Sequence, residues 1–134
     1  MKVILVNGSP HKKGCTNTAL QVVADELAAA GIDTEIFWID IKPTIGCIGC
    51  GHCSQNRRCW YDKDTVNAFL EKAETADGFV FGSPIHFAGP SGAIKAFMDR
   101  AFCGKAAIFA NKPAATVVSC RRGGATAGFD DLNK

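Results

Sequence analysis

The 134-residue sequence contains no apolar run that approaches the ~20 residues a helix needs to cross a bilayer. It also lacks an excess of charge of one sign, because 15 lysines and arginines against 13 aspartates and glutamates leave a net charge of +2. So small a charge gives no support for nucleic acid or a membrane surface as a partner. With no signal peptide before the first strand-like segment, we expect a cytoplasmic location.

Linkers, low-complexity stretches and internal repeats are absent too, apart from an alternation of strand-like and helix-like segments. The hydrophobic fraction of 47% with 21% charged residues is typical of a globular protein and excludes disordered, collagen-like and coiled-coil chains. The length is that of one domain. We therefore expect a single domain over residues 1–134.

Short apolar runs alternate with stretches whose apolar residues recur at helical spacing. We predict strands over residues 2–6, 34–39, 78–81 and 114–118, and helices over 16–30, 62–75 and 91–102. Strands alternating with helices need crossover connections, which give a parallel sheet covered on both faces. The prediction is an α/β doubly wound domain, with a ligand crevice at the carboxyl ends of its strands.

The last predicted strand lies at an edge of this sheet. It is followed by two arginines, two glycines and a stretch, residues 125–134, that looks like the beginning of a helix. Folded proteins usually cover or charge an apolar edge strand. We expect a further segment or another molecule to cover residues 114–118.

The loop after the first strand, GSPHKKGCTNT over residues 8–18, suits a phosphate group. Ser9, Thr16, Asn17 and Thr18 offer hydroxyl and amide groups beside the free N–H groups of a helix N-terminus. The Walker loop, the G-x-G-x-x-G dinucleotide turn and the C-x5-R phosphatase loop are all absent. In the alternative interpretation, these side chains only cap the helix.

The loops after the third and fourth strands reach the same predicted edge. Pro84, Ile85, His86 and Phe87 offer apolar and aromatic surface to a flat heterocycle, or alternatively form a hydrophobic plug over the next helix. Glycines after the fourth strand allow a close approach to a ligand. The edge favours an anion because six basic residues gather there: Lys12, Lys13, Arg57, Arg58, Arg121 and Arg122.

Four of the seven cysteines, Cys47, Cys50, Cys53 and Cys59, follow the spacing C-x2-C-x2-C-x5-C, while Cys15, Cys103 and Cys120 are scattered. In a reducing cytosol this clustering indicates metal binding or redox chemistry. Thiolates at steps of three with glycines between them can wrap a compact [4Fe–4S] cluster. Zinc fits less well, because its cysteine pairs are usually further apart. Free redox-active thiols are the other alternative.

Three motifs occur in order on consecutive strand–helix units: GSPHKKGCTNTAL, GSPIHFAGPSGAIKAFMDR and RRGGAT. Together they resemble the flavodoxin-like NAD(P)H-dependent FMN reductase family over essentially the whole chain. The resemblance implies strand order 2-1-3-4-5, with FMN bound where the order reverses. Relative to that family, we expect the last strand and helix to be lacking.

The resemblance also assigns residues to FMN. The phosphate would be held by Ser9, His11, Thr16, Asn17 and Thr18. The isoalloxazine would be lined by Pro84, Ile85, His86 and Phe87. Its other side would be closed by Arg121, Arg122, Gly123 and Gly124.

By the same resemblance, FMN takes a hydride from NAD(P)H and passes electrons to a flavin, quinone or other acceptor. The cofactor carries this chemistry, so no catalytic side chain is predicted. The cysteine spacing resembles that of iron-sulfur flavoproteins, which implies an alternative function as an electron carrier that accepts electrons from a ferredoxin-like donor. A noncatalytic metal-binding module would explain the cysteines but not the three loops. The family often completes its flavin site across subunits, which implies a homo-oligomer.

Overall fold

A computed structural model describes residues 1–134 of the chain. Its strands are β1 (Lys2–Asn7), β2 (Asp33–Trp38), β3 (Gly78–His86), β4 (Gly89–Pro90) and β5 (Ala114–Ser119). Four of them form a parallel sheet in the order β2-β1-β3-β5, and β4 pairs antiparallel with the end of β3. The predicted doubly wound, flavodoxin-like α/β fold is therefore confirmed.

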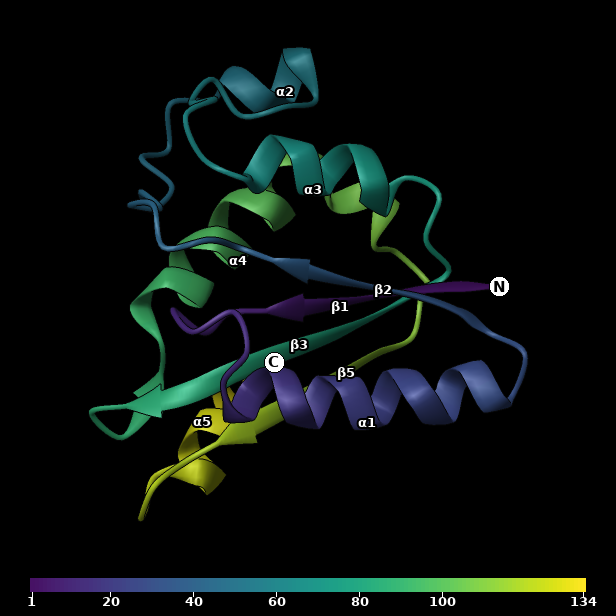
Figure 1. Cartoon of the computed structure of the whole chain (residues 1–134). Helices are drawn as coiled ribbons and strands as arrows, with labels where there is room; N and C mark the ends of the chain where they lie inside the picture. Colours follow the sequence, from purple (N-terminus) through teal and green to yellow (C-terminus); the bar gives the residue numbers. More distant parts are fainter.

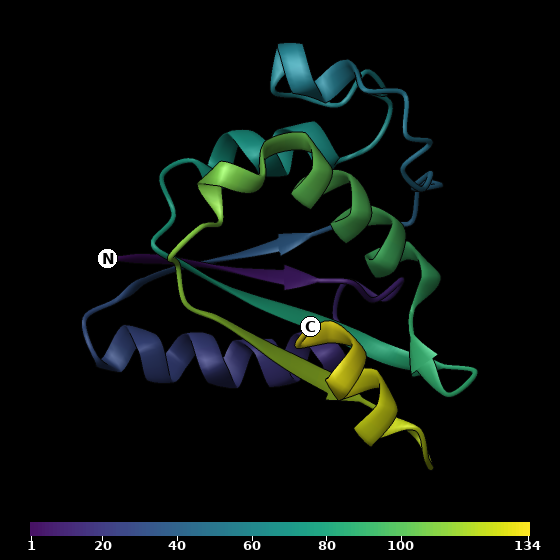
Figure 2. The same ribbon diagram turned by 180° about the vertical axis from the view of Figure 1, so that it is seen from behind.

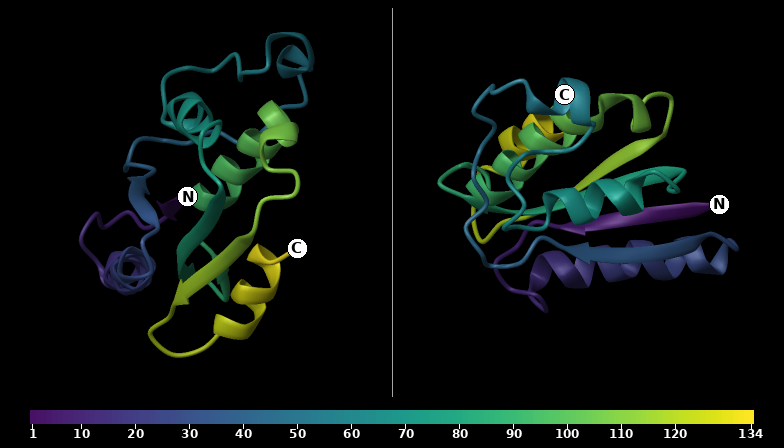
Figure 3. Two further views of the ribbon diagram at one scale, coloured as in Figure 1. Left: turned by 90° about the vertical axis from the view of Figure 1, so that its right-hand side faces the viewer. Right: turned by 90° about the horizontal axis from the view of Figure 1, so that it is seen from above.

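Helices cover both faces of this sheet. They are α1 (Cys15–Ala29), α2 (His52–Asn56), α3 (Val66–Ala73), α4 (Gly92–Lys105) and α5 (Ala125–Leu132), with a 3-10 turn at Ala106–Ile108. In Figures 1 and 3, α1 lies on one face of the sheet, whereas α3 and α4 lie on the other. Figure 2 shows α5 beside β5. None of the helices combines the length and the apolar character needed to cross a bilayer.

The central strand β1 contributes to two cores because alternate side chains point to opposite faces. Ile4 and Val6 join the larger core under α3 and α4, whereas Val3 and Leu5 pack toward α1. The larger core is rich in phenylalanine, and the rings of Phe69 and Phe97 lie 5.0 Å apart. A strand buried on both faces explains why this segment is continuously apolar.

Strand β3 is longer than the four residues predicted for it. Pairing with β5 continues as far as Pro84 opposite Ser119, and pairing with β4 then extends the strand to His86. The turn-type residues Gly82 and Ser83 lie within the strand. Pro84, Ile85 and His86, which we predicted in a loop, therefore form the end of a strand.

The helix predicted over residues 62–75 begins only at Val66. Before it, the buried side chain of Asn67 holds the preceding loop by bonds to Cys59 and Asp62. At the other end of the chain, residues 125–132 form a complete helix, and Leu132 is buried in the larger core. This helix contacts β5, but Ala114 and Ala115 of that edge strand stay exposed.

Candidate functional site

The loops that follow β1, β3 and β5 meet at the carboxyl edge of the sheet (Figure 1). A hydroxyl–hydroxyl bond of 2.9 Å between Thr16 and Ser119 connects the start of α1 to the end of β5. The Ser91 hydroxyl at the start of α4 donates to the Gly8 carbonyl at 2.9 Å. The three segments that the sequence singled out therefore lie together.

The loop after β1 is held by Asn7, the last residue of that strand, which is fully buried. Its Oδ1 accepts the Ser9 N–H at 3.0 Å, and its Nδ2 donates to the Lys12 carbonyl at 3.3 Å and to Asn17 Oδ1 at 3.4 Å. The Trp38 indole N–H donates to the Ser9 carbonyl at 2.8 Å. Four hydrogen bonds from two side chains thus hold this loop in one shape.

The N-terminus of α1 carries no side-chain cap. The N-cap position is Gly14, which has no side chain to offer, and no other side chain caps it. The alternative in which serine, threonine and asparagine only cap this helix is therefore wrong. The N–H groups of its first turn are available to an anion, which also meets the positive end of the helix dipole.

Two hydroxyl groups beside this helix end can donate to an anion as well. The Ser9 hydroxyl oxygen accepts the His11 N–H at 3.1 Å and keeps its own proton for another acceptor. Of the bonded Thr16–Ser119 pair, only one proton is used, so the second hydroxyl can still donate. Ser9 and Thr16 are buried, Asn17 is half-buried, and His11 and Thr18 are exposed.

The residues predicted to line a flat ring lie in two different environments. Ile85 packs against the loop and helix after β5. A Cβ added to Gly124 would lie 3.1 Å from the Ile85 side chain, and a Cβ added to Gly128 would lie 2.2 Å from it. Pro84 is half-buried beside it, whereas His86 is exposed and Phe87 projects fully into solvent at the tip of the β3–β4 hairpin. Arg121, Arg122 and Gly123 are exposed in the facing loop, and Gly124 lies against Ala88.

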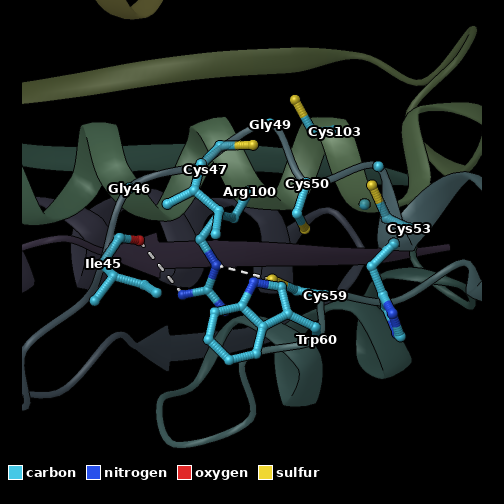
Figure 4. A pocket seen from close by; sticks show the side chains of 14 residues that line it. Ile45, Gly46, Cys47, Gly49, Cys50, Cys53, Cys59, Trp60, Arg100 and Cys103 are labelled. Carbon is cyan, nitrogen blue, oxygen red and sulfur yellow. Dashed lines mark hydrogen bonds between the residues drawn. The ribbon is translucent and has the colours of Figure 1, made fainter.

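The segment between β2 and α3 that carries Cys47, Cys50, Cys53 and Cys59, which we call the cysteine loop, lines a separate cavity of about 240 Å³. Figure 4 shows four side chains of this loop around the cavity: Cys47, Cys50, Cys53 and Cys59. All seven cysteines of the chain are free thiols. No group of three or more ligating side chains lies close enough together to hold a metal ion. We call this cavity the cysteine pocket.

Two glycines shape the backbone of the cysteine loop. Gly49 and Gly51 have φ of 65° and 73°, a left-handed conformation that favours glycine. They lie between Cys47 and Cys53, and Gly51 is the N-cap residue of α2. Both glycines have open space around them, so the backbone conformation and not side-chain crowding favours glycine at these positions.

Arg100 on α4 also lines the cysteine pocket and is 2% exposed. It forms an ion pair with Asp64, its Nη2 donates to the Tyr61 carbonyl at 2.8 Å, and its Nε donates to Cys59 Sγ at 3.2 Å (Figure 4). Burial disfavours the charge of Arg100, but hydrogen bonds to Asp64 and Cys59 outweigh it and raise the pKa. The guanidinium therefore stays charged beside a cysteine sulfur.

A model of the NADPH-dependent FMN reductase family matches residues 1–132. The chain belongs to this family. An iron-sulfur flavoprotein of Methanocaldococcus jannaschii is 38% identical over 100 residues, which cover 75% of this chain and 51% of that protein. An iron-sulfur flavoprotein of Clostridioides difficile is 30% identical over 122 residues, covering 89% of this chain and 54% of the relative.

Among solved structures, the NAD(P)H:quinone oxidoreductase from Methanothermobacter marburgensis superposes with a TM-score of 0.69 at 18% identity. The match covers 99% of this chain and 68% of that structure. A likeness at this identity concerns the fold, and it supports the flavodoxin-like architecture of the family. The chain spans about half the length of the curated relatives it matches.

Sequence patterns missed several residues of this FMN reductase family member that position the predicted ones. Asn7 could have been found as a polar residue that ends an apolar strand. Arg100 is the last residue of the second family motif and Cys103 is one of the scattered cysteines, but local patterns place neither beside the cysteine loop, because both lie on a helix that is distant from it in sequence. Cys103 lines the same pocket, where burial and then the neighbouring Cys47 raise its pKa.

Proposed function

We propose that this chain is an FMN-dependent oxidoreductase that takes electrons from NAD(P)H and passes them to a flavin, quinone or other small acceptor. The observation that carries the proposal is the uncapped start of α1, with buried hydroxyl groups beside it and a loop held by Asn7. This arrangement fits the phosphate of FMN, as does membership of the FMN reductase family.

FMN supplies hydride and single-electron transfer when it is bound. The chain's own part is to hold and orient the cofactor. In this proposal, the N–H groups of α1 and the Ser9 and Asn17 side chains bind the phosphate. The hairpin after β3 and the loop after β5 flank the ring, which brings Pro84 and the Arg121–Gly124 segment close to it.

A second candidate function is that of an iron-sulfur flavoprotein, in which the cysteine pocket holds a [4Fe–4S] cluster that exchanges electrons with FMN. It is favoured by four thiols that line one cavity, and by the iron-sulfur flavoproteins among the relatives of this chain. The donor set fits a four-iron cluster, whose ligands are four cysteine thiolates. A ferredoxin-like donor would then deliver electrons one at a time.

Two further features belong to the proposal. We expect a homo-oligomer, because Ala114 and Ala115 of the edge strand β5 and the nearby Phe102 are exposed. We also expect a cytoplasmic location, because seven free thiols persist best in a reducing compartment.

The absorption spectrum of anaerobically purified protein, with iron and sulfide analysis, tests the cofactors. Flavin absorption supports the first function, and flavin together with iron and sulfide in equal amounts supports the second. Colourless protein that cannot rebind FMN would refute both. Zinc in place of iron would refute the cluster alone.

Substitution of single cysteines tests which of those lining the pocket are ligands. Cys50→Ala should abolish iron while FMN is retained, because it removes one of the four predicted ligands. Cys103→Ala is the matched control, since it lines the same cavity outside the C-x2-C-x2-C-x5-C motif. Equal iron loss in both variants would contradict the four-ligand assignment.

The electron donor is decided by mixing the oxidised protein with candidate reductants. Bleaching of the flavin by NADH or NADPH supports the oxidoreductase. If a reduced ferredoxin bleaches the flavin and neither nicotinamide nucleotide does, the electron-carrier function replaces it.

A further inference from the structure

We propose that Arg100 is a positioning residue that holds the Cys59 sulfur and raises the reduction potential of the iron-sulfur cluster. The inference rests on the second candidate function above, which assigns that cluster to the cysteine pocket. It concerns a residue outside the cysteine motif, on α4, whose guanidinium group lies beside Cys59 (Figure 4).

Two nitrogens of the guanidinium group anchor the side chain, and the third donates to the cysteine sulfur. Nη1 contacts Asp64 and the Ile45 carbonyl, and Nη2 donates to the Tyr61 carbonyl. The remaining nitrogen, Nε, donates to Cys59 Sγ at 3.2 Å. Anchored on two sides, the side chain cannot turn its Nε–H away from the sulfur without breaking other bonds.

Cys59 itself is held in a fixed place. Its N–H donates to Asn67 Oδ1 and its carbonyl accepts from Asn67 Nδ2, both at 2.9 Å. Asn67 is 4% exposed and lies in the first turn of α3, so it ties the fourth cysteine to the protein core. Cys47 and Cys50 are exposed in the segment before α2, and Cys53 lies half-buried in that helix. Cys59 is therefore the cysteine of the motif whose backbone is bonded to a buried side chain.

Arg100 is the only permanently charged residue among those that line the pocket. Burying a charge is costly unless it is paired, and Asp64 supplies the pair with a side chain that is 1% exposed. A purely structural ion pair would not need a nitrogen directed to a sulfur. Hydrogen bonds to cluster sulfurs and nearby positive charge favour the reduced, more negatively charged cluster, which raises its potential.

Lysine cannot reproduce this arrangement. Its single ammonium can meet Asp64 or Cys59, but it lacks the planar fork that reaches both with fixed geometry. We expect Arg100→Gln to lower the equilibrium constant for one-electron reduction of the cluster by about tenfold, or about 59 mV. Arg100→Lys should fall between this variant and the wild type, because the charge is kept and the bond to sulfur is weakened.

The experiment is an anaerobic redox titration of the purified holoprotein, with the cluster followed by electron paramagnetic resonance and FMN by absorption. The FMN potential is the internal reference and should move little. Lys95→Gln is the matched control, because Lys95 is a cation on the same helix in an ion pair with Asp131. It should leave the cluster potential unchanged.

A double variant controls for destabilisation of the fold by an unpaired buried charge. Arg100→Leu with Asp64→Leu removes both buried charges, and such replacements often keep or increase stability. It should retain FMN and show the lowered potential. Loss of iron from the arginine variants, with FMN content and thermal midpoint unchanged, would also support a role in holding Cys59.

The possible results distinguish failure of the proposed cluster from failure of the proposed role of Arg100. Wild-type protein without iron and sulfide would refute the proposed cluster, whatever Arg100 does. A cluster whose potential is the same in the wild type, both single variants and the double variant would overturn the role of Arg100 alone.

Discussion

Three buried polar side chains, those of Asn7, Asn67 and Arg100, hold the segments to which function is assigned. Asn7 holds the loop before α1, Asn67 holds the backbone of Cys59, and Arg100 holds its sulfur. A buried polar group that loses its partner costs more than the bond itself contributed, because it is no longer solvated by water. Single substitutions at these positions should therefore have large effects on the loops.

Asn7→Ala should weaken FMN binding and lower the free energy of unfolding by about 1–3 kcal/mol, because it leaves the buried Ser9 N–H unpaired. Titration of flavin fluorescence and urea unfolding measure the two effects. Asn133→Ala is the control, since this exposed asparagine bonds only within the last helix. Unchanged FMN affinity in Asn7→Ala would contradict the role of Asn7 in shaping the loop.

The combined variant Ser9→Ala, Asn17→Ala tests the phosphate contacts directly. FMN binding should weaken by about 1–3 kcal/mol for each charged hydrogen bond lost. Riboflavin, which has no phosphate, should bind the variant and the wild type equally well. Equal loss of affinity for both flavins would show that the substitutions act on the ring or on the fold.

Among the elements, β1, β2 and α3 are connected by one carboxylate. Glu35 on β2 accepts from Lys2 of β1 at 2.8 Å and lies 2.6 Å from Lys72 of α3. Hydrogen bonds to Lys2 and then Lys72 lower its pKa below 4.5. A carboxyl whose pKa is lower in the folded state stabilises the fold above its unfolded pKa, and this contribution is lost as the pH falls through the folded value.

Glu35→Gln should therefore lower the free energy of unfolding at neutral pH by about 0.2–1 kcal/mol, the range for a solvent-exposed ion pair. The difference between variant and wild type should shrink well below pH 4.5. Urea unfolding at both pH values measures it, with the exposed Glu71→Gln on α3 as control. A difference that is independent of pH would mean that Glu35 acts through packing and not through its charge.

At the scale of the whole molecule, the loop after β1 and the cysteine loop leave the same edge of one sheet, after neighbouring strands β1 and β2. Side chains of both strands pack into the cores on the two faces of the sheet. A ligand that binds only the folded chain adds to the stability of the entire domain.

Added FMN should therefore raise the thermal midpoint of the flavin-free protein by about 10 °C at a hundredfold excess over its dissociation constant. Riboflavin at the same concentration should raise it less, because the contacts at the start of α1 stay unused. Scanning calorimetry or thermal fluorescence measures both shifts. An equal shift with both flavins would exclude the phosphate site proposed here.

Local patterns determined the fold class. Alternation of apolar runs and helical periodicity predicted the parallel sheet and both covering layers, since each element must bury its own apolar side. The extension of β3 to His86 was missed because strand pairing with β4 and β5, not local propensity, keeps Gly82 to His86 extended. The spacing of four cysteines likewise predicted a common site, since they lie in one loop.

By itself, the amino-acid sequence determined which segments form strands and helices, the loops between them and the family motifs, because all of these depend on residues that are close along the chain. Only the tertiary structure decided that Arg100 meets Cys59, 41 residues away, and that Cys103 joins the same pocket. Such contacts arise when helices pack on a sheet, and their partners are chosen by the geometry of packing and not by local spacing.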